Sequence, residues 1–431
     1  MINNIYKLGK KLFTINRSIT GNGVRLTLLN IKKELKKLKI HEVRSGTRFY
    51  DWKIPPEWNV KKAYVKDKNG KIIIDIKNNN LHLVGYSTPC NFFVNKSKLL
   101  EHIHSIKNQP NAIPYITSYY KKYWGFCVTD NLRKKIKKNY LNNDKFLIKI
   151  DSNFKKKGSL TYGEFILPGK SKKEILISTN ICHPQMANNE LSGPLVALAL
   201  AKHFSKYKNE KTLRFVFIPE TIGSIAYLNL NYNELKRNVI AGYTLSCIGD
   251  QRSYSFIPTK YGSTISDKAA KKAFEELNLK YKKFSFLKRG SDERQYNSPG
   301  IDLPIASILR TKYLEFPEYH TSLDNFNLMT KRGLLGGYKI VKKTIEIIMN
   351  EIIPVSKEIC EPKLQKKNLY KSLSIRNNFE STNLPRIILN FLQYADGKNT
   401  IHDISKHIKI PINKTLEIYK LLYKQNLLEK N

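Results

Sequence analysis

Acidic residues and cysteines are scarce in this 431-residue sequence, and no long apolar run occurs in it. Five scattered cysteines without a C-x-x-C pair predict reduced thiols in a cytoplasmic protein rather than a disulfide scaffold. The absence of an apolar stretch of about 20 residues argues against a transmembrane helix. The N-terminus also lacks the apolar core and cleavage site of a signal peptide, so we expect no membrane partner.

The shortage of acidic residues leaves a formal net charge of +41, from 76 lysines and arginines against 35 aspartates and glutamates. Such a charge suggests nucleic acid or an anionic surface as a partner. The excess, however, is mostly lysine spread along the whole chain, with heavy use of Asn, Ile, Tyr and Phe, a composition typical of an AT-rich genome. A phosphate-binding surface would concentrate its charge and favour arginine. We therefore expect only weak, salt-sensitive attraction to polyanions and no specific DNA partner.

Strand and helix patterns divide the chain into four parts. Residues 1–40 and 126–355 are predicted to form one α/β domain, because alternating strands and helices favour a largely parallel sheet with helices on both faces. Residues 41–125 are rich in β patterns, with a hairpin signal at Lys68-Asn69-Gly70-Lys71, and predict a small inserted β-rich domain. Residues 356–380 are predicted to be a linker, and residues 381–431 a separate unit.

The C-terminal unit has three predicted helices and resembles a winged-helix module. Its third helix offers Lys414, Lys420 and Lys424, so DNA binding is one interpretation. That helix has no arginine, and we find no cluster suited to reading base edges. A protein–protein contact is the interpretation that we favour.

The stretch 181–198, ICHPQMANNELSGPLVAL, is the centre of the predicted α/β domain. It follows a short apolar strand and leads into a helix, with His183, Asn189 and Glu190 in the polar turn between them. Open α/β sheets bind ligands at such strand ends.

Three further predicted strand ends carry side chains suited to metal binding or proton transfer. A hydrolytic zinc site needs imidazole and carboxylate ligands, an open position for water, and one more carboxylate as the base. Two histidines and several carboxylates from different strand ends supply these groups: His183, Glu190, Glu220, Asp292, Glu293, His320 and Asp324.

The motifs H-P-x-x-A-N-N-E-L-S-G, P-E-T-I-G and Y-H-T-S-x-D, in this order, resemble those of the zinc-dependent aminopeptidase family. More closely, the chain resembles an aminopeptidase-like branch of uncharacterised bacterial proteins with a small inserted domain and a C-terminal winged helix. The resemblance covers nearly the whole chain. It implies a three-layer α/β/α fold of the phosphorylase/hydrolase-like type, and genes of this branch are often associated with surface-polysaccharide biosynthesis.

The resemblance also implies roles for individual residues. His183 and His320 match metal ligands, and Glu220 matches the general base that activates the metal-bound water. Three positions depart from the family pattern: Asn189 stands for the aspartate that bridges two metals, Thr221 for the second glutamate of a Glu-Glu pair, and Ser246 for a further aspartate.

These departures predict a weakened second metal site. We expect one zinc ion, held by His183, by Glu190 or Asn189, and by His320, with Asp250 or Asp292 as a further ligand. Two zinc ions are the alternative.

Two neighbouring residues are candidates for substrate binding. Arg294 offers a fork for a carboxylate or phosphate, or forms an internal salt bridge with Asp292. Tyr319 either helps to stabilise an oxyanion or packs beside His320.

The sequence thus predicts a metal-dependent hydrolase of an amide bond, most similar to an aminopeptidase. Its expected substrate is a small peptide or an amide-containing, amino-sugar-linked molecule, and a homo-oligomer is compatible with the sequence. The alternative is a protein with a degenerate site that works in binding or regulation through the β-domain and the winged helix.

Overall fold

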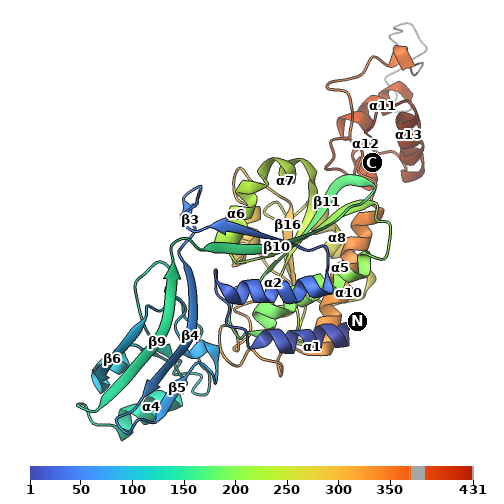
Figure 1. Cartoon of the computed structure of the whole chain (residues 1–431). Coiled ribbons are helices and arrows are strands. Elements are labelled where there is room, and N and C mark those ends of the chain that lie inside the picture. Colours follow the sequence, from blue (N-terminus) through green and yellow to red (C-terminus); the bar gives the residue numbers. More distant parts are fainter. Residues whose placement is uncertain (368, 370–383, 430–431) are drawn as a thin grey trace.

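An eight-stranded mixed sheet forms the centre of the computed structural model, which describes residues 1–367, 369 and 384–429 (Figure 1). Its strand order is β1-β10-β12-β11-β13-β16-β14-β15, and the four central strands β12, β11, β13 and β16 are parallel. The parallel centre confirms the predicted α/β class. The strands are β1 (Lys39–Arg44), β10 (Ser159–Leu167), β11 (Ser171–Asn180), β12 (Lys211–Ile218), β13 (Val239–Leu245), β14 (Ser255–Ile257), β15 (Lys282–Lys283) and β16 (Ile305–Leu309).

Both faces of this sheet are covered. Along β11, Ile175 and Ile177 belong to one hydrophobic core and Leu176 belongs to another, because successive side chains of a strand point to opposite faces. The first core is completed by α1 (Ile2–Phe13), α2 (Asn22–Glu34), α5 (Ser192–Phe204), α8 (Ile265–Glu276) and α10 (Lys331–Asn350). The second face packs against α6 (Ile222–Leu230), α7 (Tyr232–Asn238) and α9 (Glu293–Tyr296). This is the predicted three-layer α/β/α arrangement.

A second, four-stranded sheet has the order β5-β4-β9-β6 and extends from the first (Figure 1). Its strands are β4 (Glu57–Lys66), β5 (Ile72–Asp75), β6 (Cys90–Asn95) and β9 (Lys145–Lys155), joined by the short elements β2 (Arg48–Phe49), β3 (Trp52–Lys53), α3 (Lys96–Glu101), β7 (Ile103–His104), β8 (Phe126–Cys127) and α4 (Asp130–Asn139).

The boundaries of this small domain differ from the predicted range 41–125. Strand β1 pairs with β10 in the large sheet, so residues 41–44 lie outside the small domain. Strand β9, which we expected in the large sheet, pairs with both β4 and β6. The alternating pattern of β9 fits either sheet equally well, and its pairing partners are far away in sequence. Local pattern therefore could not assign it.

The small domain shares a hydrophobic core with the large one. Trp58 and Phe146 of the small sheet belong to the same buried cluster as Leu176 and Ile218 of the large sheet. The small domain is therefore packed against the face of the large sheet that carries α6, and is not joined to it by a linker alone.

The C-terminal unit contains α11 (Leu384–Gln393), α12 (Ile401–Ile408) and α13 (Ile412–Lys424) around its own core. It contacts the large domain through an ion pair between Lys268 Nζ and Asp403 Oδ1 at 2.7 Å, and through a backbone hydrogen bond from Ile401 to Ile352. Residues 368 and 370–380 of the predicted linker 356–380 lie outside the described residues, as do residues 381–383 and 430–431 of the predicted C-terminal domain.

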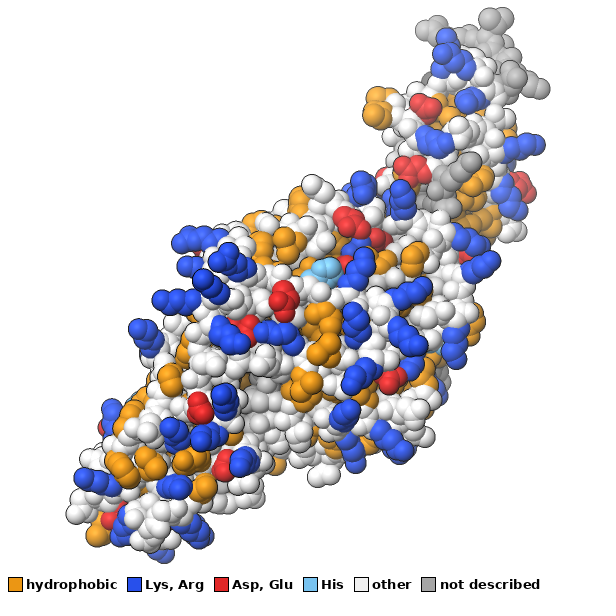
Figure 2. Space-filling view, viewed as in Figure 1, with side chains coloured by type: hydrophobic (Ala, Val, Ile, Leu, Met, Phe, Trp, Pro, Cys, Tyr) orange, Lys and Arg blue, Asp and Glu red, His pale blue; other side chains and the backbone are white. Residues whose placement is uncertain are grey.

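Lysine and arginine side chains are scattered over the face shown in Figure 2, from the small sheet to the C-terminal helices. This scattered distribution agrees with the interpretation that the positive charge comes from the lysine-rich composition of the whole chain. No helix among the described residues has the length and apolar character needed to cross a membrane.

A buried arginine joins three neighbouring strands of the large sheet. Arg214 on β12 is 1% exposed and forms ion pairs at 2.6 Å with Glu164 on β10 and with Glu174 on β11. The hydroxyl of Tyr227 on α6 donates to Glu164 at 2.6 Å. Both buried carboxylates therefore pair with this one guanidinium, and Glu164 also lies 3.9 Å from His41 Nε2.

Substitution of Arg214 by methionine should lower the free energy of unfolding by about 3–5 kcal/mol, because it leaves two buried carboxylates without a counterion. Urea unfolding followed by circular dichroism measures this change. The control is Lys98→Met, which removes the exposed pair with Glu101 and should leave the unfolding midpoint unchanged. Equal midpoints for the two variants would contradict the structural role of Arg214.

Candidate functional site

The loop after β11 is held in place by a buried carboxylate. Residues Ala187–Leu191 form one turn of π-helix that runs directly into α5. Asp324, which is fully buried, accepts hydrogen bonds from the backbone N–H groups of Ala187, Asn188 and Asn189 at 3.2, 2.6 and 2.8 Å. Since Asp324 ends the motif Y-H-T-S-x-D, this contact joins the loops of two of the predicted site motifs.

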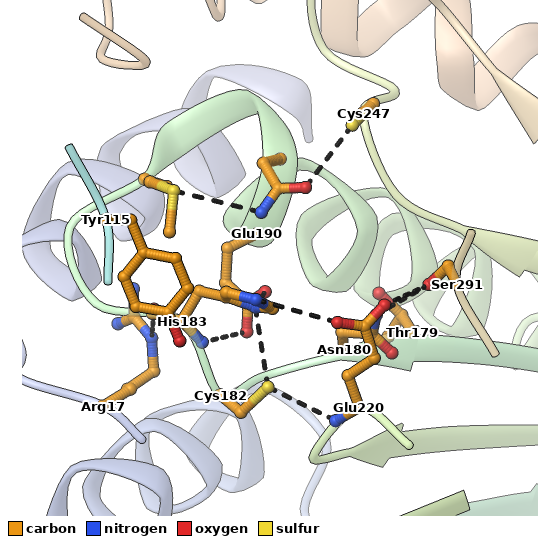
Figure 3. A network of polar contacts seen from close by, with 12 residues as sticks. Arg17, Tyr115, Thr179, Asn180, Cys182, His183, Glu190, Glu220, Cys247 and Ser291 are labelled. Atoms are coloured by element: carbon orange, nitrogen blue, oxygen red, sulfur yellow. Dashed lines mark hydrogen bonds and ion pairs between the residues drawn. The ribbon is translucent and has the colours of Figure 1, made fainter. Parts of the chain in front are cut away.

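His183 is oriented by Glu190. Its Nδ1 lies 2.7 Å from Glu190 Oε2, its backbone N–H donates to Glu190 Oε1 at 2.8 Å, and its Nε2 faces Glu220 Oε2 at 3.7 Å (Figure 3). A carboxylate on one imidazole nitrogen leaves the other nitrogen for a metal, which is the usual arrangement of metal-binding histidines. Glu190 therefore lies behind His183 as an orienting group, whereas the sequence predicted a metal ligand.

The charge on Glu190 also acts on the protonation of His183. Burial alone would lower the pKa of His183, but the neighbouring Cys182 and Glu190 raise it well above its usual range. Burial raises the pKa of the Cys182 thiol to about 11, so Glu190 supplies the negative charge at neutral pH. The position of the His183 ring thus favours a positive charge, which either a proton or a metal ion on Nε2 can supply.

Glu220 lies just after β12, with its carboxylate toward His183 (Figure 3). Ser291 Oγ donates to Glu220 Oε1 at 2.8 Å, and the Glu220 backbone N–H donates to Cys182 Sγ at 3.3 Å. Burial raises the pKa of Glu220, while the charge at His183 acts in the opposite direction. A raised pKa brings a carboxylate closer to the range in which it both accepts and returns a proton near neutral pH.

The turn that carries Glu220 is held by Asp292 and Arg294. Thr221 has a left-handed backbone with φ 63°, which is uncommon for a β-branched residue. Its N–H donates to Asp292 Oδ1 at 2.8 Å, and its hydroxyl accepts a hydrogen bond from Arg294 Nη2 at 2.5 Å. Ser224 Oγ also donates to Asp292 Oδ1, at 2.9 Å. The guanidinium predicted to bind substrate is thus engaged with the residue next to the base.

His320 approaches His183 from the loop before Asp324, and the two ring centroids are 5.3 Å apart. Tyr319 stacks on the ring of His320 at 3.9 Å and an interplanar angle of 15°, which is the packing role considered for it above. Burial and the positive charge at His183 lower the pKa of His320 to about 3. This imidazole is therefore neutral, as a metal ligand must be.

Two predicted ligands are engaged elsewhere. Asn189 Oδ1 accepts a weak hydrogen bond from Cys247 Sγ at 3.6 Å, and its Nδ2 lies 4.0 Å from Met186 Sδ. Asp250 accepts hydrogen bonds from the backbone N–H and the hydroxyl of Thr311 at 2.9 and 2.7 Å. The structure brings together His183, Glu220 and His320, and it engages Asp250 in hydrogen bonds with Thr311.

Sequence reasoning did not assign three other residues of the site. Ser291 holds the base, as described above. Arg17 is buried and donates from Nε to the carbonyl oxygen of His183 at 3.0 Å. Tyr115 of the small domain lies edge-on to both imidazoles, at centroid distances of 5.0 Å to His183 and 5.2 Å to His320. The segments RSITGNGVR and AIPYITSYY marked the regions of Arg17 and Tyr115 only as parts of the family resemblance.

The chemistry of the donors at this site suits a zinc ion. Two imidazoles face each other, and Asp292 Oδ2 is a buried carboxylate oxygen without a hydrogen-bond partner. Burial and the charge of Glu220 raise the pKa of Asp292 to about 7, while the positive charge of Arg294 acts in the opposite direction. In the part of the chain that the structure describes, one close group of three potential ligands occurs, Cys182–His183–Glu190, and it lies on the Nδ1 side of His183. Tetrahedral zinc accepts such nitrogen and oxygen ligands.

Comparisons with known proteins agree with this architecture. A family model described as a domain of unknown function, DUF4910, matches residues 6–351, and a winged helix-turn-helix model matches residues 352–430. A Clostridium acetobutylicum protein, provisionally named a polysaccharide biosynthesis protein with an aminopeptidase-like domain, is 40% identical over 426 residues, which cover 99% of this chain and 96% of the relative.

Two solved structures extend the comparison. A crystal structure of a protein from Clostridium acetobutylicum, provisionally described as a peptidase, has a TM-score of 0.79 at 39% identity and covers 99% of this chain and 96% of its own. A zinc aminopeptidase from Bacillus subtilis has a TM-score of 0.60 at 13% identity, over 80% of this chain and 93% of its own. The predicted fold and winged helix are confirmed.

The different contacts of Glu190 and Asn189 predict different effects of truncation. Glu190→Ala leaves two donors of His183 without an acceptor in a buried position and should lower the free energy of unfolding by about 1–3 kcal/mol. Asn189→Ala, the matched control from the same helical turn, removes contacts to two sulfur atoms, which are weak partners, and should cost less. Denaturant unfolding measures both. A larger loss for Asn189→Ala would contradict the assignment of Glu190 as the orienting group.

Proposed function

We propose that this chain, which belongs to the DUF4910 family, is a metal-dependent hydrolase of an amide bond with an activity similar to that of an aminopeptidase. The observation that carries the proposal is the line Glu190–His183–Glu220. Glu190 binds one imidazole nitrogen of His183 at 2.7 Å, and the other nitrogen faces Glu220 at 3.7 Å. In a histidine with a purely structural role, Glu190 alone would satisfy the imidazole, and a second, partly exposed carboxylate at that distance would add nothing.

Glu220 is the proposed general base. Its Oε1 is fixed by Ser291, which leaves Oε2 toward His183 for a water molecule. The carboxylate takes a proton from that water and returns it to the nitrogen of the departing amine. The raised pKa of Glu220 favours both transfers.

His183 and His320 would hold one zinc ion, with the unpaired oxygen of Asp292 as a further candidate ligand. When bound, zinc polarises the amide carbonyl and acidifies water. Arg294, Thr221 and Asp292 position the turn that carries the base. Asn189 and Asp250 fit supporting roles better than ligation, because their oxygens already have partners.

The proposed substrate is a small peptide or an amide linked to an amino sugar. The name of the Clostridium acetobutylicum relative supports the second class, since it refers to polysaccharide biosynthesis. Hydrolysis that requires a free α-amine would identify a peptidase, and hydrolysis of N-acylated amino sugars would identify a deacylase. The free state of all five cysteines supports work in a reducing compartment such as the cytoplasm.

The alternative is a binding or regulatory protein with a degenerate site. It is favoured by the neutral residues Asn189, Thr221 and Ser246 at three family carboxylate positions, since they leave a second metal without its ligands. In this case the winged helix, which contacts the large domain through Lys268 and Asp403, would serve as a protein contact. The two experiments below separate the alternatives.

Purified protein should contain about one zinc ion per chain, measured by elemental mass spectrometry, because His183 and His320, with Asp292 as the candidate third ligand, offer donors for one tetrahedral site. His183→Ala should lose this metal, whereas His402→Ala, at an exposed position on α12, should retain it. Two ions per chain would require a second ligand set. No metal after incubation with zinc, cobalt or manganese would exclude the hydrolase proposal.

Glu220→Gln should keep the metal and the fold but lower kcat by about 100-fold or more, because an amide cannot accept the proton. Aminoacyl 4-nitroanilides and N-acetylated amino sugars form the first substrate panel. Glu210→Gln changes an exposed carboxylate and is the control. Unchanged turnover in Glu220→Gln would show that another group is the base.

A further inference from the structure

A segment of the small domain lies across the site. Residues 112–120, which we call the tyrosine strap, bind the loop of His320 by backbone hydrogen bonds: Tyr115 N–H donates to the His320 carbonyl at 2.8 Å, and Ser322 N–H donates to the Ile113 carbonyl at 2.9 Å. On its other side, Gly85 N–H donates to the Ile116 carbonyl at 2.9 Å. The strap is therefore anchored to both domains, with a defined position above the two imidazoles.

The ring of Tyr115 covers the histidine pair. It meets His183 at an interplanar angle of 65° and His320 at 84°, so the edge of one phenol ring contacts both imidazoles. Edge-to-face contacts of this kind fix ring orientation. Tyr115 thus forms a wall of the site next to the proposed metal position.

The hydroxyl groups of Tyr115 and Tyr119 lie 3.1 Å apart and share one hydrogen bond. Two phenols carry two O–H donors, and one shared bond uses only one of them. The second O–H is therefore available to a ligand. Burial raises the pKa of Tyr119 to about 12, so its phenol remains protonated and can donate.

Either hydroxyl of the pair can act as the donor in the shared bond. With Tyr115 as that donor, the free O–H belongs to Tyr119. The Tyr119 hydroxyl lies 3.1 Å from that of Tyr115, whose ring contacts both imidazoles, so it lies close to the histidine pair. The backbone of Tyr119 has a positive φ of 40°, which is uncommon for a bulky residue.

We propose that the small domain completes the active site, with the Tyr119 hydroxyl donating a hydrogen bond to the carbonyl oxygen of the scissile amide and Tyr115 holding that hydroxyl in place. The inference rests on the function proposed above. It makes Tyr119 a catalytic residue and Tyr115 a positioning residue, and it gives the inserted domain a chemical role.

The test compares four phenylalanine variants on the substrate of the panel that the unmodified chain hydrolyses best. Tyr119→Phe should lower kcat by about 100-fold, the effect of removing one donor from a developing oxyanion, with KM nearly unchanged. Tyr115→Phe should have a smaller effect of the same kind. Tyr120→Phe is the matched control, because the hydroxyl of Tyr120 donates to the Lys53 carbonyl at 2.8 Å, away from the histidines. Tyr319→Phe tests the competing donor beside His320.

A binding measurement adds a readout that a purely structural residue would not affect. A phosphinic dipeptide analogue, which carries a tetrahedral anionic centre, should bind about 10-fold or more weakly to Tyr119→Phe by calorimetry, while a free amino acid should bind both forms equally. Circular dichroism and the thermal midpoint should match those of Tyr120→Phe.

Two outcomes would overturn this inference and leave the proposed function intact. In an active chain, Tyr119→Phe could behave like Tyr120→Phe, or the loss could occur in Tyr319→Phe instead. A chain that hydrolyses no substrate of the panel and binds no analogue would remove the proposed function, and this inference with it.

Discussion

One buried carboxylate, that of Asp324, determines the geometry of the site. It accepts the three N–H groups at the start of the π-helical turn, which have no partner within the helix. The helical turn then returns Glu190 to His183, and the loop of Asp324 itself carries His320. Without this contact the two histidines would belong to two independent loops. The chemistry proposed here therefore depends on a backbone contact made by a residue that touches neither imidazole.

Much of this arrangement could be predicted from the sequence, because the carboxyl ends of parallel strands meet at one edge of a sheet. That rule brings together His183 and Glu220, and the family resemblance adds His320. Spacing along the chain does not reveal which atom a side chain contacts. Glu190 was predicted as a ligand, yet it lies on the Nδ1 side of His183, and the helical turn that directs it there has no distinct sequence signal.

Long-range pairing explains the other differences. Strand β9 has the alternating pattern of any half-buried strand, and only its pairing with β4 and β6 assigns it to the small sheet. The contact of Tyr115 with the histidines was not predicted for a similar reason, since Tyr115 lies more than sixty positions before His183 in the printed sequence. A motif search centred on strand ends does not reach it, because it comes from an inserted domain.

The contacts of the tyrosine strap have a consequence for how molecules enter and leave. The strap is hydrogen-bonded to the loop of His320 on one side and to Gly85 on the other. The domain behind it shares a hydrophobic core with the large sheet. Opening it as a lid would break backbone hydrogen bonds and separate a common core. The strap is therefore a fixed wall of the site, so we expect turnover to need no closing and reopening of this segment.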